Sequence, residues 1–216
     1  MIVITGMPDS GSSFLANYIA ELGFFLGNPR DIQGVTGMHP KGTGEHLRIS
    51  HETWGLLDKK RQIKFYPGDK LPSMPLALAE CKAARDVMGE IIKRQGVQLV
   101  KDCSAPWTYL CYPESAEFVI ITRNWRNMTK KFLEYIGYEG LTKEDIQHGW
   151  VKWQSVCLRG IKQNRRWYQV GYEDFATKEG RETELAKLCK YLGVEIPTGA
   201  QLDTMNAVYC PGGAND

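Results

Sequence analysis

The residues best suited to chemistry lie near the amino terminus, in the run Gly6-Met7-Pro8-Asp9-Ser10-Gly11-Ser12-Ser13. This run directly follows a short apolar stretch and directly precedes a helical pattern. Glycine lets the backbone curl so that successive N–H groups converge, and a following helix adds unpaired N–H groups and the positive end of its dipole. The hydroxyls of Ser10, Ser12 and Ser13 are further donors. The run therefore predicts a binding site for a phosphate group.

The spacing of the two glycines, Gly6 and Gly11, is that of a P-loop, with four residues between them. In nucleoside triphosphatases a lysine follows the second glycine, because its ammonium contacts the terminal phosphates. Here that position is Ser12. Serine in place of lysine disfavours an ATP-dependent small-molecule kinase. Such a kinase is an alternative interpretation of the turn.

Short apolar segments alternate with helical patterns along the chain. Four β-rich segments predict buried strands, over Ile2–Thr5, Val97–Val100, Phe118–Thr122 and Trp167–Val170. Apolar residues at helical spacing predict helices over Ser13–Leu22, Leu76–Arg94, Thr142–Gln163 and Glu182–Leu192. Strands that alternate with helices favour a parallel sheet covered on both faces. The expected fold is therefore a three-layer α/β/α domain with a central parallel sheet and a P-loop.

The 216 residues suit one such domain. Residues 28–75 interrupt the alternation, because they are rich in Gly, Pro and charge with aromatic residues between them. We interpret this segment as a partly helical insertion that forms a lid over a second substrate. Trp54 and Phe65 in it, with Trp107 and Tyr109, are either pocket or core residues.

Composition limits the partners and the compartment. The net charge of +2 is too small to indicate nucleic-acid or membrane-surface binding. The six cysteines form no CxxC pair, so we expect neither a disulfide framework nor a zinc site. The amino terminus does not have the pattern of a signal peptide, and no apolar run has the length of about 20 residues that a membrane helix needs. A cytoplasmic protein is the expectation.

Four segments in order resemble the bacterial-type sulfotransferase family, which uses 3′-phosphoadenosine 5′-phosphosulfate (PAPS). The first is the Gly6–Leu15 turn and helix start, followed by Leu22-Gly23-Phe24-Phe25-Leu26-Gly27. The others are Val100-Lys101-Asp102, the run from Phe118 to Asn127, and Val170-Gly171-Tyr172-Glu173-Asp174-Phe175 with the helix that ends at Gly193. Pro40-Lys41-Gly42 with Glu45 also resembles a family stretch. The similarity extends from the start of the chain to about Gly193.

The resemblance implies a reaction and a set of binding residues. A sulfuryl group passes from PAPS to a hydroxyl or amine of a small-molecule or glycan acceptor, the 3′,5′-bisphosphate (PAP) is released, and no metal is required. The resemblance assigns the 5′-phosphosulfate to the turn, the 3′-phosphate to an arginine and a second cation, and the adenine side to a tyrosine. In this sequence those residues are Asp9, Ser10, Gly11, Ser12, Ser13, Phe14, Arg123, Lys131 and Tyr172.

The resemblance leaves the catalytic base open. Relatives have a histidine two residues after the second-strand lysine, where this chain has Cys103. Lys101 and Asp102 are catalytic candidates at the strand end, although Asp102 is also suited to orienting the loop. Glu45, or its neighbour His46, is the candidate from the insertion.

Two departures from the family bear on activity. Relatives carry a lysine or arginine just before the Ser-Gly pair, whereas this chain has Asp9. An acid about 4 Å from a phosphosulfate costs roughly 4 kcal/mol at an effective dielectric near 20, so Asp9 must point away, pair with a cation such as Lys101, or weaken the site. Lys131 stands where relatives have a serine. A protein of the same fold that binds a nucleotide without transferring a sulfuryl group is therefore the alternative to an active enzyme.

Overall fold

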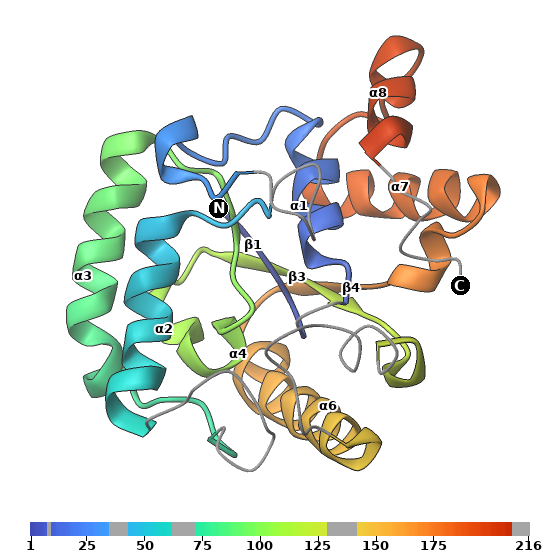
Figure 1. Ribbon diagram of the computed structural model, residues 1–216. Helices are drawn as coiled ribbons and strands as arrows, with labels where there is room; N and C mark the ends of the chain where they lie inside the picture. The colour runs from blue at the N-terminus through green and yellow to red at the C-terminus, as the bar shows by residue number, and fades with distance from the viewer. Residues whose placement is uncertain (8–9, 35–42, 62–71, 129–141, 209–216) are drawn as a thin grey trace.

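A four-stranded parallel sheet, in the order β2-β1-β3-β4, organises the chain (Figure 1). The computed structural model describes residues 1–7, 10–34, 43–61, 72–128 and 142–208. The strands are β1 (Ile2–Gly6), β2 (Leu99–Lys101), β3 (Glu117–Thr122) and β4 (Trp167–Gly171). The helices are α1 (Ser12–Ala20), α2 (Leu47–Arg61), α3 (Leu78–Gln95), α4 (Ala105–Thr108), α6 (Lys143–Cys157), α7 (Lys178–Leu192) and α8 (Ala200–Val208). Single helical turns lie at Pro29–Asp31, Tyr109–Cys111, Leu158–Lys162 and Tyr172–Phe175.

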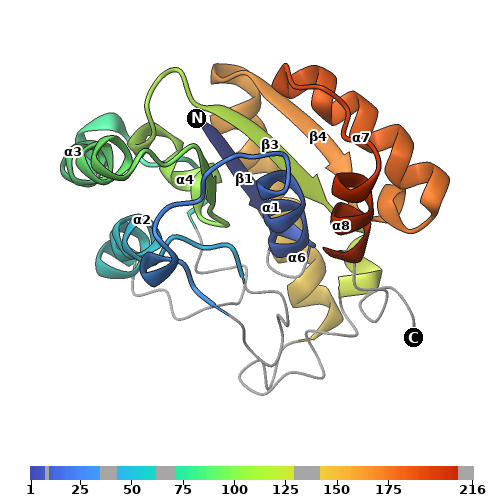
Figure 2. The ribbon, with the colours of Figure 1, turned by 90° about the horizontal axis from the view of Figure 1, so that it is seen from above.

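Side chains on successive residues of a strand point to opposite faces of the sheet, and each face has its own core. Val3 on β1 and Phe118 on β3 belong to one core, which α2, α3, α4 and α6 cover. Ile4 on β1 and Val119 on β3 belong to the other, which α1, α7 and α8 cover. Figure 2 shows the sheet between these two layers. The predicted three-layer α/β/α fold is confirmed.

The four predicted strands are present, and each observed strand lies within two residues of its predicted limits. β1, β2 and the middle of β3 are buried, as parallel strands covered on both faces are, whereas β4 at the edge of the sheet is partly exposed. A capping box begins α6, within the predicted helix Thr142–Gln163. Thr142 Oγ1 accepts from Asp145 N at 3.1 Å, and Asp145 Oδ2 accepts from Thr142 N at 2.8 Å.

Helix α7 begins at Lys178, four residues before its predicted start. Thr177 caps it, because its hydroxyl accepts from Gly180 N at 3.0 Å. The helix ends at the predicted Gly193, which has a φ of 70° in the left-handed region. The short α4 and the carboxy-terminal α8 were not predicted.

The segment interpreted as an insertion contributes α2, which packs beside α3 through Ile49 and Leu57. Before α2, residues 32–33 and 43–46 lie side by side. Gln33 N donates to Glu45 O at 2.8 Å, and Thr43 N donates to Gln33 O at 3.3 Å. No helix in the described ranges is both long enough and apolar enough to cross a membrane.

Candidate functional site

The carboxyl ends of the four strands bring several of the predicted site residues to one edge of the sheet. Gly6 ends β1 and Lys101 ends β2, while Arg123 directly follows β3 and Tyr172 directly follows β4. The chain passes from β1 to β2 on one side and then crosses to β3 on the other. Ligands of open α/β sheets bind at the carboxyl ends of the strands beside such a switch.

The glycine- and serine-rich turn has the geometry that an anion site requires. Gly11 has a φ of 93°, and its carbonyl accepts the first bond of α1, from Leu15 N at 3.0 Å. The N–H groups before Leu15 have no partner inside the helix, and glycine has no side chain to cap them. A Cβ at Gly6 would lie 2.2 Å from Ser10 Oγ, so only glycine leaves room for that hydroxyl.

The hydroxyl of Ser10 points to a ligand. Ser10 is 1% exposed, and its Oγ has no hydrogen-bond partner within the described ranges. A buried hydroxyl without a partner costs about 1–3 kcal/mol. Ser12 and Ser13 are also buried in the same turn. A phosphate or sulfate oxygen would accept from the Ser10 hydroxyl and from the first N–H groups of α1, so the turn fits such a group.

Tyr172 lies against this turn, and Arg123 lies over the Tyr172 ring. The Arg123 guanidinium carbon is 4.6 Å from the centre of the Tyr172 ring, and both residues are 8% exposed. A Cβ on Gly11 would lie 2.2 Å from the same ring. The Tyr172 ring also meets Phe14 edge-on, at 6.0 Å between ring centres. The phosphate turn, an aromatic face and a buried arginine therefore form one continuous surface.

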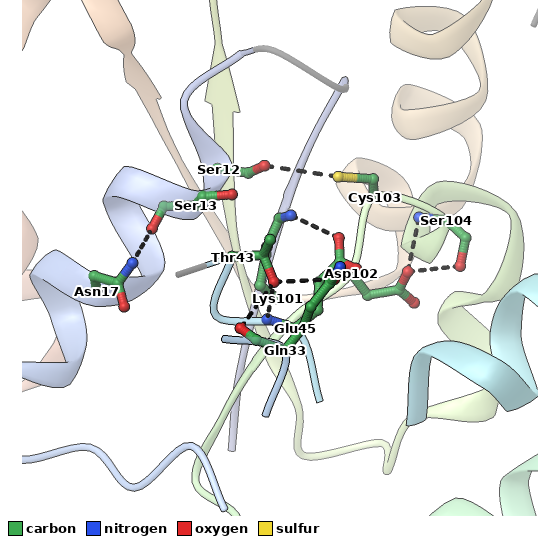
Figure 3. Close-up of polar contacts among 10 residues, drawn as sticks. All are labelled: Ser12, Ser13, Asn17, Gln33, Thr43, Glu45, Lys101, Asp102, Cys103 and Ser104. Atoms are coloured by element: carbon green, nitrogen blue, oxygen red, sulfur yellow. Dashed lines mark hydrogen bonds and ion pairs between the residues drawn. The ribbon is translucent and has the colours of Figure 1, made fainter. Parts of the chain in front are cut away.

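Lys101 and Glu45 form an ion pair at the end of β2, with 2.6 Å between Lys101 Nζ and Glu45 Oε1 (Figure 3). The lysine side chain is 6% exposed and the glutamate side chain 23%. Burial disfavours the ammonium charge, but Cys103 and the hydrogen-bonded Glu45 carboxylate outweigh it and raise the pKa of Lys101. Thr43 orders this glutamate, because its hydroxyl accepts from Glu45 N at 3.3 Å. Glu45 and Lys101 thus meet although 56 positions separate them.

Asp102 is oriented away from the pair, towards Ser104 and Tyr112. Its Oδ1 accepts from Ser104 N at 2.8 Å and from Ser104 Oγ at 2.6 Å, and its Oδ2 accepts from Tyr112 OH at 2.7 Å. The residue is fully buried, and burial raises the pKa of its carboxyl above the ordinary value of 3.8. These contacts give Asp102 a structural role in shaping the turn after β2.

Cys103 occupies the position at which the resemblance expected a histidine. Its thiol lies 3.6 Å from Ser12 Oγ, which joins the β2 end to the phosphate turn (Figure 3). Burial raises the pKa of Cys103 to about 11, so the sulfur is a neutral thiol at pH 7. A thiol in that state does not accept a proton as a histidine would.

His46 contacts the end of α3, whereas Glu45 contacts Lys101. His46 Nε2 lies 3.2 Å from Gln95 Oε1, at the end of α3, and Gln95 Nε2 donates to Asp31 Oδ2 at 2.7 Å. Successive side chains of an extended segment alternate in direction, which separates His46 from the site that Glu45 reaches. Trp107 and Tyr109 are core residues, and Trp54 packs against that core.

Several predicted residues lie outside the described ranges, among them Asp9, Lys131, Lys41 and Phe65. Sequence reasoning missed other residues that hold the site together. Tyr112 and Ser104 bind Asp102, Thr43 orders Glu45, and Trp150 Nε1 donates to the Arg123 carbonyl at 3.1 Å. These are long-range pairs of ordinary residue types, and no local pattern in the sequence marks them. Within the described ranges, no group of three or more His, Cys, Asp or Glu residues could hold a metal ion.

Comparisons with known proteins bear on the fold. No family model matches the sequence, and no curated protein matches it. Among solved structures, a sulfotransferase domain from the curacin biosynthetic pathway is 15% identical with a TM-score of 0.50, over 94% of this chain and 76% of that one. The likeness shows a shared fold. A sugar kinase from a Janibacter species is 13% identical over 97% of each chain, but at a TM-score of 0.44 it supports no argument.

Proposed function

We propose that this chain binds PAPS and transfers its sulfuryl group to a hydroxyl or amine of a small-molecule or glycan acceptor. One observation carries the proposal: the Tyr172 ring lies against Gly11 of the phosphate turn and also under the Arg123 guanidinium. The site thus offers two groups suited to anions, and one aromatic ring contacts both. PAPS has the matching chemistry, because its adenosine carries a 5′-phosphosulfate and a 3′-phosphate. The fold shared with a sulfotransferase domain is consistent with this assignment.

The binding roles follow from the chemistry of each residue. Ser10 and the first N–H groups of α1 would hold the 5′-phosphosulfate. Arg123 would hold the 3′-phosphate, because its planar guanidinium donates two parallel hydrogen bonds to an oxyanion. Tyr172 would lie beside the adenine. Lys131, eight residues after Arg123, remains a predicted second cation for the 3′-phosphate.

In the reaction, an acceptor oxygen or nitrogen forms a bond to sulfur while the bond from sulfur to the bridging phosphate oxygen breaks. PAP leaves with the electron pair of that bond, and the acceptor loses one proton. We assign the proton to the Glu45 carboxylate, which lies in hydrogen-bond contact with Lys101. Lys101 is charged and buried, so its ammonium would stabilise the negative charge that develops on the leaving phosphate. Asp102 would support the turn, since its carboxylate accepts from Ser104 and Tyr112.

The alternative is a protein that binds the nucleotide but does not transfer the sulfuryl group. The neutral thiol of Cys103, where relatives have a histidine, favours it, and so does Asp9 in place of a cation.

Asp9→Lys separates the two functions. In a weakened enzyme the added cation raises the rate of sulfuryl transfer, and we expect the variant to stay folded. An unchanged or lower rate would show that Asp9 does not replace a leaving-group contact.

Calorimetric titration with PAP, 5′-AMP and ATP tests the binding half of the proposal. We expect PAP to bind at least about tenfold more tightly than 5′-AMP, because only PAP carries the 3′-phosphate for Arg123. Tighter binding of ATP than of PAP would contradict the proposal and favour the kinase. Incubation with sulfur-35 PAPS and a panel of small alcohols, amines and oligosaccharides then tests transfer. Label in an acceptor indicates the enzyme, whereas PAP binding without transfer to any panel member favours the alternative.

A further inference from the structure

One carboxylate joins the turn after β3 to the end of β4. Glu173 Oε1 accepts from Asn124 N at 3.0 Å and from Asn127 Nδ2 at 3.0 Å. Asn124 in turn caps the helical residues 125–128, because its Oδ1 accepts from Arg126 N at 3.0 Å. The Glu173 carboxylate therefore lies at the amino-terminal end of a helical turn, where a negative charge is favourable.

The hydrogen bond between Glu173 and Asn124 joins the residues that follow Tyr172 and Arg123. Arg123 directly precedes Asn124, and Tyr172 directly precedes Glu173. The ladder between β3 and β4 ends at the pair Thr122–Gly171, one residue before both. Beyond the ladder, the Glu173 bonds continue the connection, so the backbone that carries Arg123 stays fixed relative to the Tyr172 ring.

We propose that Glu173 is a positioning residue for the 3′-phosphate, and that it acts through Arg123. The proposal rests on the proposed function, because it assumes that Arg123 binds that phosphate. A long arginine side chain has many rotamers, and binding is tighter when its geometry is set before the ligand arrives. Trp150 holds the Arg123 carbonyl on one side, and Glu173 holds the following amide on the other. Arg123 is thereby kept over the tyrosine ring.

The test measures PAP and 5′-AMP affinity by calorimetry for Glu173→Ala, Glu173→Gln, Arg123→Ala and the Glu173→Ala, Arg123→Ala double variant. Glu173 is exposed, so its replacement leaves the core unchanged. Glu195→Ala is the control, because it removes the same charge at an exposed position that follows the carboxyl-terminal end of α7. Urea unfolding of each variant accompanies the titrations.

We expect Glu173→Ala to weaken PAP about tenfold, which is about 1.4 kcal/mol, and 5′-AMP less than about twofold. Glu173→Gln keeps the accepting oxygen and should stay within about threefold of the wild type. In the Arg123→Ala background the loss of Glu173 should have no further effect on PAP, because the residue through which it acts is gone.

The following results would overturn this inference and leave the proposed function standing. One is wild-type affinity for PAP in Glu173→Ala, and another is a full tenfold loss in the Arg123→Ala background as well. Equal losses for PAP and 5′-AMP, or for Glu173→Ala and Glu195→Ala, would also overturn it, because they indicate a general effect. If the wild-type chain itself does not bind PAP, the proposed function fails, and this inference with it.

Discussion

At the scale of single residues, the proposed function makes Arg123 the residue that selects the nucleotide. It is buried, lies over Tyr172 and directly follows a central strand, so its position is set by the sheet. Hydrogen bonds to charged groups contribute about 1.5–3 kcal/mol, which corresponds to roughly 10- to 100-fold in affinity. Such a group discriminates between ligands that differ by one phosphate.

We therefore expect Arg123→Ala to weaken PAP by about 10- to 100-fold and 5′-AMP by less than about threefold. Calorimetric titration of the two ligands measures both losses. Arg94→Ala is the matched control, because Arg94 is an exposed arginine in the last turn of α3, at the other end of the sheet. Equal losses of affinity for PAP and 5′-AMP would show that Arg123 does not bind the 3′-phosphate.

Asp102 gives a second prediction at this scale, from its raised pKa. A carboxyl whose pKa is higher in the folded than in the unfolded state binds more protons when folded, so the free energy of unfolding falls as pH rises above 3.8. Asp102→Asn does not titrate and keeps an oxygen that accepts from Ser104. We expect the variant to gain stability relative to the wild type as pH rises above 3.8. Urea unfolding over a pH series measures the difference.

Removal of the side chain should have the opposite effect. Asp102→Ala leaves the buried donors of Ser104 and Tyr112 without their acceptor, at a cost of about 1–3 kcal/mol for each unsatisfied group. If Asp102→Asn instead abolished transfer while PAP binding and stability stayed at wild-type levels, Asp102 would be a catalytic residue rather than a support for the turn.

At the scale of elements, local patterns predicted the parts of the fold that local energies specify. The strands were visible because each is a short apolar run, and the start of α6 because Thr142 and Asp145 satisfy the helix end within three residues. The phosphate turn was visible because its glycines are needed locally, Gly11 for its φ of 93° and Gly6 to leave room for Ser10 Oγ. Helix α2 was predicted only as partly helical structure, because its packing against α3 depends on distant residues.

The pairs that complete the site could not be predicted locally. Glu45 meets Lys101, and Tyr112 meets Asp102, only once the sheet and the segment before α2 are in place. Glu173 was part of the quoted Tyr-Glu-Asp run, but its contacts with Asn124 and Asn127 depend on the adjacency of β3 and β4. The sequence thus predicted the strand ends at which Lys101, Arg123 and Tyr172 lie, and the fold determines their partners.

The phosphate turn provides a prediction at this scale, from two glycines with positive φ. Gly11 (φ 93°) and Gly193 (φ 70°) both adopt the left-handed conformation, which costs a residue with a Cβ about 1–2 kcal/mol. A Cβ on Gly11 also meets Tyr172 at 2.2 Å, whereas a Cβ on Gly193 meets nothing within 4 Å. We expect Gly193→Ala to lose only that stability, and Gly11→Ala to lose more and to bind PAP at least about tenfold more weakly.

Urea unfolding and calorimetry on the two variants separate the effects. Gly11 and Gly193 have a similar backbone conformation, but only the methyl group of Gly11→Ala meets the Tyr172 ring. Equal PAP affinity for Gly11→Ala and Gly193→Ala would mean that the Gly11–Tyr172 contact does not shape the binding site.

At the scale of the whole molecule, the proposed nucleotide site joins elements that belong to both layers. β1 and β3 contribute side chains to the two cores, and the site lies at the carboxyl ends of the same strands. Because both cores share these strands, unfolding of one core would expose the other. We therefore expect a single cooperative unfolding transition by fluorescence and by circular dichroism, although the chain is longer than most two-state domains.

A ligand that binds only the folded chain must then stabilise all of it. At a PAP concentration 100 times its dissociation constant, the free energy of unfolding should rise by about 2.7 kcal/mol, with an unchanged dependence on urea. Arg123→Ala at the same PAP concentration should show a much smaller rise, because its affinity is lower. Two transitions, of which PAP shifts only one, would contradict the shared-strand argument, since they would show that the two layers unfold independently and that the nucleotide stabilises one layer alone.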